Sequence, residues 1–444
     1  MTISRGAKAL AALGAVYLLF SGVMSALAPC GSWDNVVFGA KLWNEGDPGG
    51  YYLPSAHELY SSHGRLLYPG HPGLTLQILL HAIQAAYYAA RAPAGAGFAA
   101  FIAAHLARVF LLSKLAMTVA HLASFGLFLA FARRLLRNER AAVFAAFGYA
   151  TCWPVAYYLS RVSVEPLMIV CFLGTFLSLW RHEDDGRPRW AALAGFAAVS
   201  GLATKFHLLW PLPLLGAAML RRRPKGLAAF ALAAGAALAL YTALLDWRDF
   251  FAYWEVPAVL AGSPIRHVLL GLPRMPLENW LPGPTRSGIF LLCEGPLLAT
   301  AAYGLALFVR RRDPERFRLV WPAAAVGYTV LIWLYRCVAV TGDFQGFHYL
   351  FPFMLLAALF FGLGSDALLA RAPASGKVLW LVLIHGVVLR AVLDTRVKDA
   401  AFYRRVRPYQ ASNPRLYGLG IIRDTPPTRS TLIDALIAAI PKGL

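Results

Sequence analysis

Charged residues are scarce in this chain. They make up 14% of its 444 residues, whereas soluble globular domains contain about 25%. Hydrophobic residues account for 59%, and the mean hydropathy is +0.56. A soluble core of this size cannot bury so much apolar surface. The composition therefore excludes an ordinary soluble protein and indicates a chain whose solvent is the lipid bilayer.

Acidic residues are rarer still, with 22 Asp and Glu against 42 Lys and Arg, which gives a net charge of +20. In a soluble protein this excess would point to nucleic acid. Here the basic residues form tight clusters between apolar runs, which is typical of membrane orientation signals. We therefore expect the lipid bilayer, and no nucleic acid, as a partner.

Cysteines are few, and the five in the chain form no CxxC pair and no His/Cys metal spacing. The histidines at 57, 63 and 71 match no standard zinc pattern either. The sequence predicts no disulfide framework and no metal or other cofactor. The first apolar run, Ala9–Ala28, is long for a signal peptide and is followed by Pro29, so we expect a retained helix.

Apolar runs long enough to span a bilayer predict an all-α polytopic protein with about eleven transmembrane helices. The stretch 190–220 accounts for two of these, broken near Lys205 and at its prolines. The other nine expected spans are 8–28, 105–132, 140–159, 163–181, 226–245, 288–309, 319–336, 347–370 and 377–394.

The segment 71–91 is apolar enough to span but carries two His and two Gln, and counting it would invert every later loop. Leaving it out places 20 Lys and Arg in 46 cytoplasmic residues and 8 in 131 outer residues. The positive-inside rule favours this arrangement, so we expect a re-entrant or juxtamembrane helix. The transmembrane domain then covers 1–394, with outer loops at 29–104 and 246–286, and the tail is 395–444.

The first outer loop carries the most informative pattern. Apolar residues recur at helical spacing over Asp34–Glu45, which predicts an amphipathic helix on the membrane surface. Asp34 opens it, in the position of an ordinary N-cap. A second short helix is expected over Leu53–Ser61. A turn, 68–73 (YPGHPG), then leads into the apolar helix of 71–91.

An acidic residue opening a juxtamembrane helix, followed by a Pro-containing turn into an apolar segment, resembles the GT-C glycosyltransferases. The resemblance is greatest to protein O-mannosyltransferases and the aminoarabinose transferases that modify lipid A. It implies that Asp34 is the catalytic base. The turn reads His71-Pro72-Gly73-Leu74, where the family has Lys or His followed by Pro-Pro-Leu. A Lys at that first position can meet the lipid phosphate, and His71 stands in its place.

Three later stretches resemble family motifs at the outer face. In SRVSVEPLM (160–168), Arg161 precedes Glu165, which replaces the family's Asp. GLATKFH (201–207) carries Lys205 near the outer end of the fifth expected span. GFHYLFPF (346–353) has His348 and Tyr349 where the family has Arg-Tyr. The resemblance covers roughly 30–390 and implies that these residues bind the donor phosphate or substrate.

Each of these residues also has a structural interpretation. Glu165 and Arg161 would pair at a helix mouth, Lys205 would snorkel to the interface, and His71 and His348 would be ordinary interfacial residues. The function implied is transfer of a sugar, with inversion, from a polyprenyl phosphate to a lipid A, glycan or protein acceptor outside the bacterial inner membrane.

Three alternatives stay open. A membrane transporter or lipid-linked-sugar flippase would show internal repeats and mid-membrane ionisable groups, whereas this chain has no convincing repeat and its notable polar groups gather at one face. A polysaccharide polymerase or ligase would place its large loop late in the chain. A degenerate family member with a scaffolding role would explain the departures at His71, Gly73, Glu165 and His348.

Overall fold

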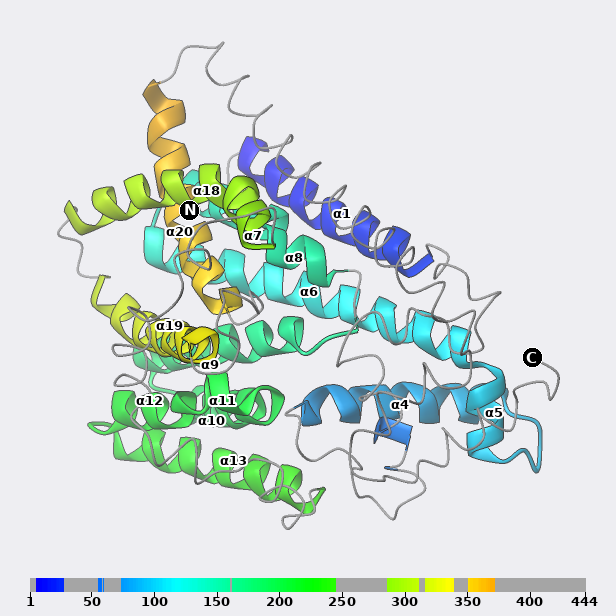
Figure 1. The fold of residues 1–444 in the computed structure, drawn as a ribbon. Coiled ribbons are helices and arrows are strands. Elements are labelled where there is room, and N and C mark those ends of the chain that lie inside the picture. The colour runs from blue at the N-terminus through cyan, green and yellow to red at the C-terminus, as the bar shows by residue number, and fades with distance from the viewer. Residues whose placement is uncertain are drawn as a thin grey trace.

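The computed structural model describes residues 5–27, 55–57, 59, 73–159, 162–244, 286–310, 316–338 and 350–371, and within these ranges it is helical without β-strands (Figure 1). In chain order, the helices are α1 (Arg5–Leu27), α4 (Leu74–Arg91), α5 (Phe98–Ala104), α6 (Leu106–Leu136), α7 (Glu139–Thr151), α8 (Trp153–Tyr158), α9 (Glu165–Asp185), α10 (Pro188–Thr204), α11 (Phe206–Leu209), α12 (Pro211–Leu220), α13 (Pro224–Ala243), α18 (Arg286–Arg310), α19 (Arg316–Arg336) and α20 (Phe351–Arg371).

Four described helices are long and apolar enough to cross a membrane. They are Arg108–Leu136 within α6, Pro224–Ala243, Phe317–Tyr335 within α19, and Phe351–Arg371. Shorter apolar helices cover Ala11–Phe20 and Pro211–Leu220. The described part of the chain is thus that of an all-α membrane protein, which confirms the predicted class. The count of eleven spans stays a prediction, and the expected span 377–394 and the tail 395–444 lie outside the described residues.

Two helix interruptions lie where the backbone chemistry requires them. The apolar run 140–159 is divided between α7 and α8, because Pro154 in the first turn of α8 disfavours helical continuity with the residues before it. The expected break near Lys205 is confirmed: α10 ends at Thr204, and Lys205 has φ −152° and ψ 83°, outside the helical region. Pro211 then begins α12.

The ambiguous segment 71–91 forms α4, which is absent from the four candidate spans among the described residues. It packs against α6 and α5, and its beginning contacts the end of α10. In Figure 1 it continues beyond the end of α10. The described residues Ser55–His57 are helical, as expected for a short helix over Leu53–Ser61.

Close helix packing is made possible by glycines. A Cβ at Gly304 in α18 would lie 1.9 Å from the Phe360 carbonyl oxygen of α20, and one at Gly195 in α10 would lie 2.2 Å from the Phe230 oxygen of α13. No side chain fits in either place, so glycine lets the backbones approach. Small residues serve this purpose in membrane bundles, where the lipid supplies no hydrophobic force between helices.

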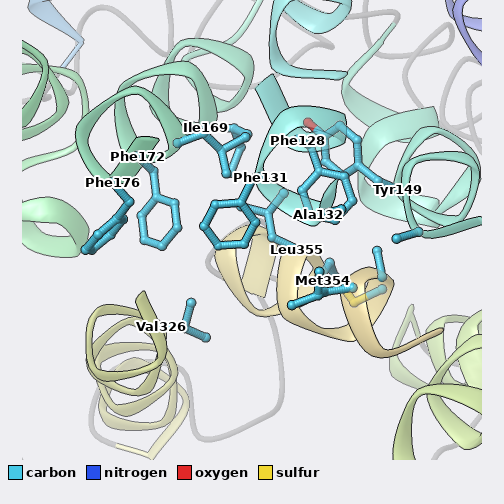
Figure 2. Close-up of a cluster of buried hydrophobic side chains, with 14 of the residues drawn as sticks. Phe128, Phe131, Ala132, Tyr149, Ile169, Phe172, Phe176, Val326, Met354 and Leu355 are labelled. Atoms are coloured by element: carbon cyan, nitrogen blue, oxygen red, sulfur yellow. The ribbon is translucent and has the colours of Figure 1, made fainter. Parts of the chain in front are cut away.

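The main core lies where α6, α7, α9, α19 and α20 meet (Figure 2). Phe131 of α6 lies on the side of Phe172 of α9, and its ring stacks on Trp180 with centroids 5.0 Å apart, whereas Phe128 packs on Tyr149 of α7. A second, smaller core joins α4, α5 and the first half of α6. The bundle therefore carries a separate packed layer at one end.

The opposite end of the bundle, called the Asp184 end here, is held by charged groups. Asp184 of α9 binds Arg134 of α6, and it binds Arg318 of α19 at 3.3 Å. On α20, Asp366 accepts a 2.8 Å hydrogen bond from Asn138, which also caps α7. These contacts tie α6 to α9 and α19, and α7 to α20.

Candidate functional site

The structure describes two of the seven residues predicted for the site, Glu165 and Lys205. The expected base Asp34 lies outside the described residues, as do the expected phosphate- or substrate-binding residues His71, Arg161, His348 and Tyr349. Glu165 and Lys205 are therefore the described part of the predicted site.

Glu165 and Lys205 form a buried ion pair. The Lys205 Nζ donates a hydrogen bond to Glu165 Oε1 at 2.8 Å, and each side chain is 4% exposed. Lys205 thus lies inside the protein and does not snorkel to a surface. The partner of Glu165 thus lies 40 positions away in the sequence. The pairing of Glu165 with Arg161 stays a prediction, because Arg161 lies outside the described residues.

Local structure explains why this pair forms. Glu165 is in the first turn of α9, and Lys205 caps the end of α10. A helix N-terminus favours a negative charge and a C-terminus a positive one, so each group is supported by its own helix. The two helices pack together and are joined by a short turn in which Gly186 adopts φ 68°. The turn makes them antiparallel, which returns Lys205 to Glu165; we call this side of the bundle the Glu165 end.

Burying the Glu165–Lys205 pair has a free-energy cost. Removing two charges from water costs several kcal/mol per ion, and only good geometry and further hydrogen bonds offset that cost. Glu165 uses Oε1 for the lysine, while its buried Oε2 has no hydrogen-bond partner among the described residues. A half-satisfied buried carboxylate is a poor stabilising device. This favours a functional explanation over a purely structural one.

Hydroxyl groups connect this pair to α4. Thr204, next to Lys205, shares a 2.6 Å hydrogen bond with Thr75 at the start of α4, and its hydroxyl also approaches the Ser200 carbonyl at 2.6 Å. Tyr241 of α13 donates to the Ser200 hydroxyl at 2.9 Å. The start of α4, three residues after His71 in the sequence, therefore adjoins Lys205's end of α10.

Part of the first loop is fastened to α4 by polar contacts. Ser55 donates to Gln77 at 2.5 Å, and His57 hydrogen-bonds Gln84 at 3.2 Å. On the same helix, His81 Nδ1 bonds the Ala56 carbonyl at 2.9 Å. Three of the four polar residues noted in 71–91, Gln77, His81 and Gln84, thus hold residues 55–57. This contact was not visible in the sequence.

Sequence reasoning missed His121 of α6. Its side chain is fully buried, and neither ring nitrogen makes a well-formed hydrogen bond within the described residues. The ring's weaker polar interactions are with the Tyr158 backbone and, electrostatically, with Glu165. Its signal in the sequence is an ionisable residue in the middle of an apolar run, which at membrane depth indicates function by default.

Comparison with known proteins adds no relative: no protein-family model matches the chain, and no curated protein matches it. The family resemblance therefore rests on the motifs in the sequence. The prediction that the protein needs no metal also stays a prediction.

Proposed function

We propose that the protein transfers a sugar from a polyprenyl-phosphate donor to an acceptor at the outer face of a bacterial inner membrane, with inversion and with Asp34 as general base. The supporting observation is the buried pairing of Lys205 with Glu165. Two stretches chosen for their likeness to glycosyltransferase motifs meet at one end of the bundle, and residues 55–57 of the first loop are bound to α4, whose start contacts α10.

The proposed reaction breaks the bond between the anomeric carbon and a phosphate oxygen and forms one from that carbon to an acceptor hydroxyl. Asp34 receives the hydroxyl proton, and the phosphate leaves with the bonding electron pair. Charge builds up on the leaving phosphate, so a cation beside it accelerates the step. Lys205 is the described candidate for that cation.

Glu165 would act on Lys205 through the 2.8 Å hydrogen bond, which fixes the direction of the Lys205 side chain. A fixed cation costs little reorganisation when the phosphate becomes more negative. Glu165 is therefore a positioning residue for the lysine in this proposal.

Two of the remaining predicted residues, Arg161 and His71, lie close in the sequence to described residues at the Glu165 end. Arg161 precedes Glu165 by four positions and His71 precedes Thr75 by four, a reach of at most about 15 Å in each case. We propose that both contact the donor phosphate, with His348 and Tyr349 completing the substrate site. Apolar helix surfaces would accommodate the polyprenyl tail, since the described bundle exposes large hydrophobic side chains on α1, α13 and α19.

The test is a transfer assay in membranes from cells that make the wild-type protein, Asp34→Asn or Asp185→Asn. Membranes receive radiolabelled sugars as undecaprenyl-phosphate conjugates, and labelled products are sorted by extraction into lipid, glycan and protein. We expect transfer with the wild type and with Asp185→Asn, whose exposed carboxyl lies at the opposite end of α9, and none with Asp34→Asn. Normal turnover in Asp34→Asn would remove it as the base.

A transporter or flippase of lipid-linked sugars is the second candidate. The observation that favours it is the buried Lys205, Glu165 and His121 inside a membrane bundle, because ionisable groups there also mark transport pathways. Movement of labelled lipid between leaflets of proteoliposomes, without transfer to any acceptor, would favour this candidate over the enzyme.

A further inference from the structure

His121 and Glu165 present unused hydrogen-bonding atoms to the interior. Both ring nitrogens of His121 and the Oε2 of Glu165 are buried without a hydrogen-bond partner among the described residues. The two groups interact electrostatically. Most buried polar atoms in native proteins have a partner, so these three atoms, on the helices α6 and α9 that pack together, need an explanation.

His121 lies far from the Asp184 end of the bundle, at a depth where polar groups are costly. It lies 13 residues before Arg134, which binds Asp184, so it is about 20 Å along α6 from the Asp184 end. That distance is within the roughly 30 Å hydrocarbon thickness of a bilayer. An imidazole there without a partner costs free energy that a leucine of similar size would not. The protein tolerates a destabilising residue beside a charged pair.

The elements around His121 define what could bind there. The groups that interact with His121 are the carboxylate of Glu165 at the start of α9 and the backbone of Tyr158 at the end of α8. Lys205 of α10 reaches the same carboxylate. On α6 itself, Lys114 lies two helical turns away, with its amine 4.9 Å from the Phe110 ring centre.

The hydrogen-bonding capacity of these groups selects a chemical class. A carboxylate oxygen only accepts, whereas a neutral imidazole offers one donor and one acceptor. An anion would be repelled by Glu165 Oε2, and a cation would be repelled by Lys205. A hydroxyl group satisfies both partners, because it can donate to Glu165 and accept from the imidazole N–H.

We propose that His121 and Glu165 Oε2 bind a hydroxyl of the donor's sugar, next to the Lys205 that faces its phosphate. The inference rests on the proposed function and extends it by placing the sugar in the bundle, between α6 and α9. It makes His121 a substrate-binding residue that is kept at a cost in stability.

The experiment measures the unfolding temperature of the purified protein in detergent, alone and with undecaprenyl phosphate or a panel of undecaprenyl-phosphate hexoses and pentoses. A bound ligand stabilises the folded state by an amount that grows with the logarithm of ligand concentration over dissociation constant, so tighter binding gives a larger increase. We expect the wild type to be stabilised by the phosphate lipid and more strongly by at least one sugar lipid. This additional increase is the sugar increment.

In His121→Leu we expect an unliganded unfolding temperature equal to or above that of the wild type. Stabilisation by undecaprenyl phosphate should be retained, and binding of the sugar lipid should weaken at least tenfold, to the level of the phosphate lipid. His121→Asn, which keeps a donor and an acceptor, should retain part of the sugar increment. His182→Leu, at the Asp184 end, is the matched control and should leave the increment unchanged.

The outcomes separate the two proposals. A sugar increment unchanged in His121→Leu overturns this inference and leaves the proposed function intact. Loss of unliganded stability in both His121→Leu and His121→Asn shows a structural core histidine and also overturns it. Absence of any sugar increment in the wild type overturns the proposed donor class and the inference together.

Discussion

Lys205 and Glu165 lie 2.8 Å apart at the ends of two antiparallel helices, each at the helix terminus that favours its charge. Because both side chains are buried, water cannot solvate the charge that remains if the other residue is removed. This relationship predicts that the two residues are coupled in stability as well as in activity.

A double-mutant cycle tests this coupling. Removing one partner of a buried ion pair costs about 3–5 kcal/mol because the other charge is left uncompensated, whereas replacing both with apolar residues is far less costly. We expect Glu165→Leu and Lys205→Met each to lower the unfolding free energy by about that amount, and the double variant to be more stable than either single one. All three should lack transfer activity.

Unfolding by a detergent titration would supply the free energies of this cycle. A double variant whose loss equals the sum of the single losses would contradict the coupling. Transfer activity retained in the double variant would show the pair to be structural only.

The contacts of the helix glycines predict that substitution by alanine has very different effects on stability at Gly304 and at Gly235. In Gly304→Ala the new methyl would lie 1.9 Å from the Phe360 oxygen, so α18 and α20 must separate. We expect a loss of several kcal/mol, in the upper range for overpacking. Gly235→Ala, where no described atom lies within 4 Å, should be neutral or stabilise by up to about 1 kcal/mol through helix propensity.

Thermal unfolding of the two glycine variants beside the wild type is the measurement. Equal unfolding temperatures for Gly304→Ala and Gly235→Ala would show that α18 and α20 do not pack this closely.

Orientation in the membrane can be tested with two exposed turns. Ala94 lies between α4 and α5, and Arg222 lies between α12 and α13. In a cysteine-free background, we expect Ala94→Cys to react with a membrane-impermeant maleimide in intact cells, and Arg222→Cys to react only after permeabilisation. The reverse pattern would invert the predicted topology and place the Glu165 end in the cytoplasm.

Glu183, near the Asp184 end, gives a pH prediction. Partial burial raises the pKa of its carboxyl, and the attraction of Arg318 and Arg223 does not offset this effect. The folded state then binds the proton more tightly than the unfolded state, so the resulting stability is present below the unfolded pKa and is lost as pH rises through the folded pKa.

Glu183→Gln, which stays neutral, should therefore lack this loss. Relative to the wild type, its unfolding temperature should rise as the pH increases above about 4. Parallel curves for the two proteins over that range would show that Arg318 and Arg223 fully compensate the burial of Glu183.

Local features of the fold were predictable from the sequence. The apolar runs marked helices through 370, and the departure from helix at Lys205 followed from its position before Pro211 and within a run too long for one span. The interruption at Cys152, between α7 and α8, was missed, although Pro154 signalled it. These features depend on residues close together in the chain.

The site itself was only partly predictable. Glu165 and Lys205 were singled out separately, but their pairing depends on how α9 packs against α10, and neither periodicity nor charge pattern reports such packing. His121 was hidden for a similar reason, since its lack of partners is a property of the assembled bundle. The role of Gln77 and Gln84 in holding residues 55–57 also required the structure.

The polar contacts at the Asp184 end connect five helices at one end of the bundle. Ion pairs of Asp184 join the ends of α6, α9 and α19, and Asp366 joins α20 to α7. If the helices separate to admit a polyprenyl chain, they should separate at the Glu165 end and stay in contact at the Asp184 end. A protein that opens at one end only would take up donor lipid from one leaflet of the membrane. Donor lipids made in the other leaflet would first have to be moved across the membrane by a separate protein.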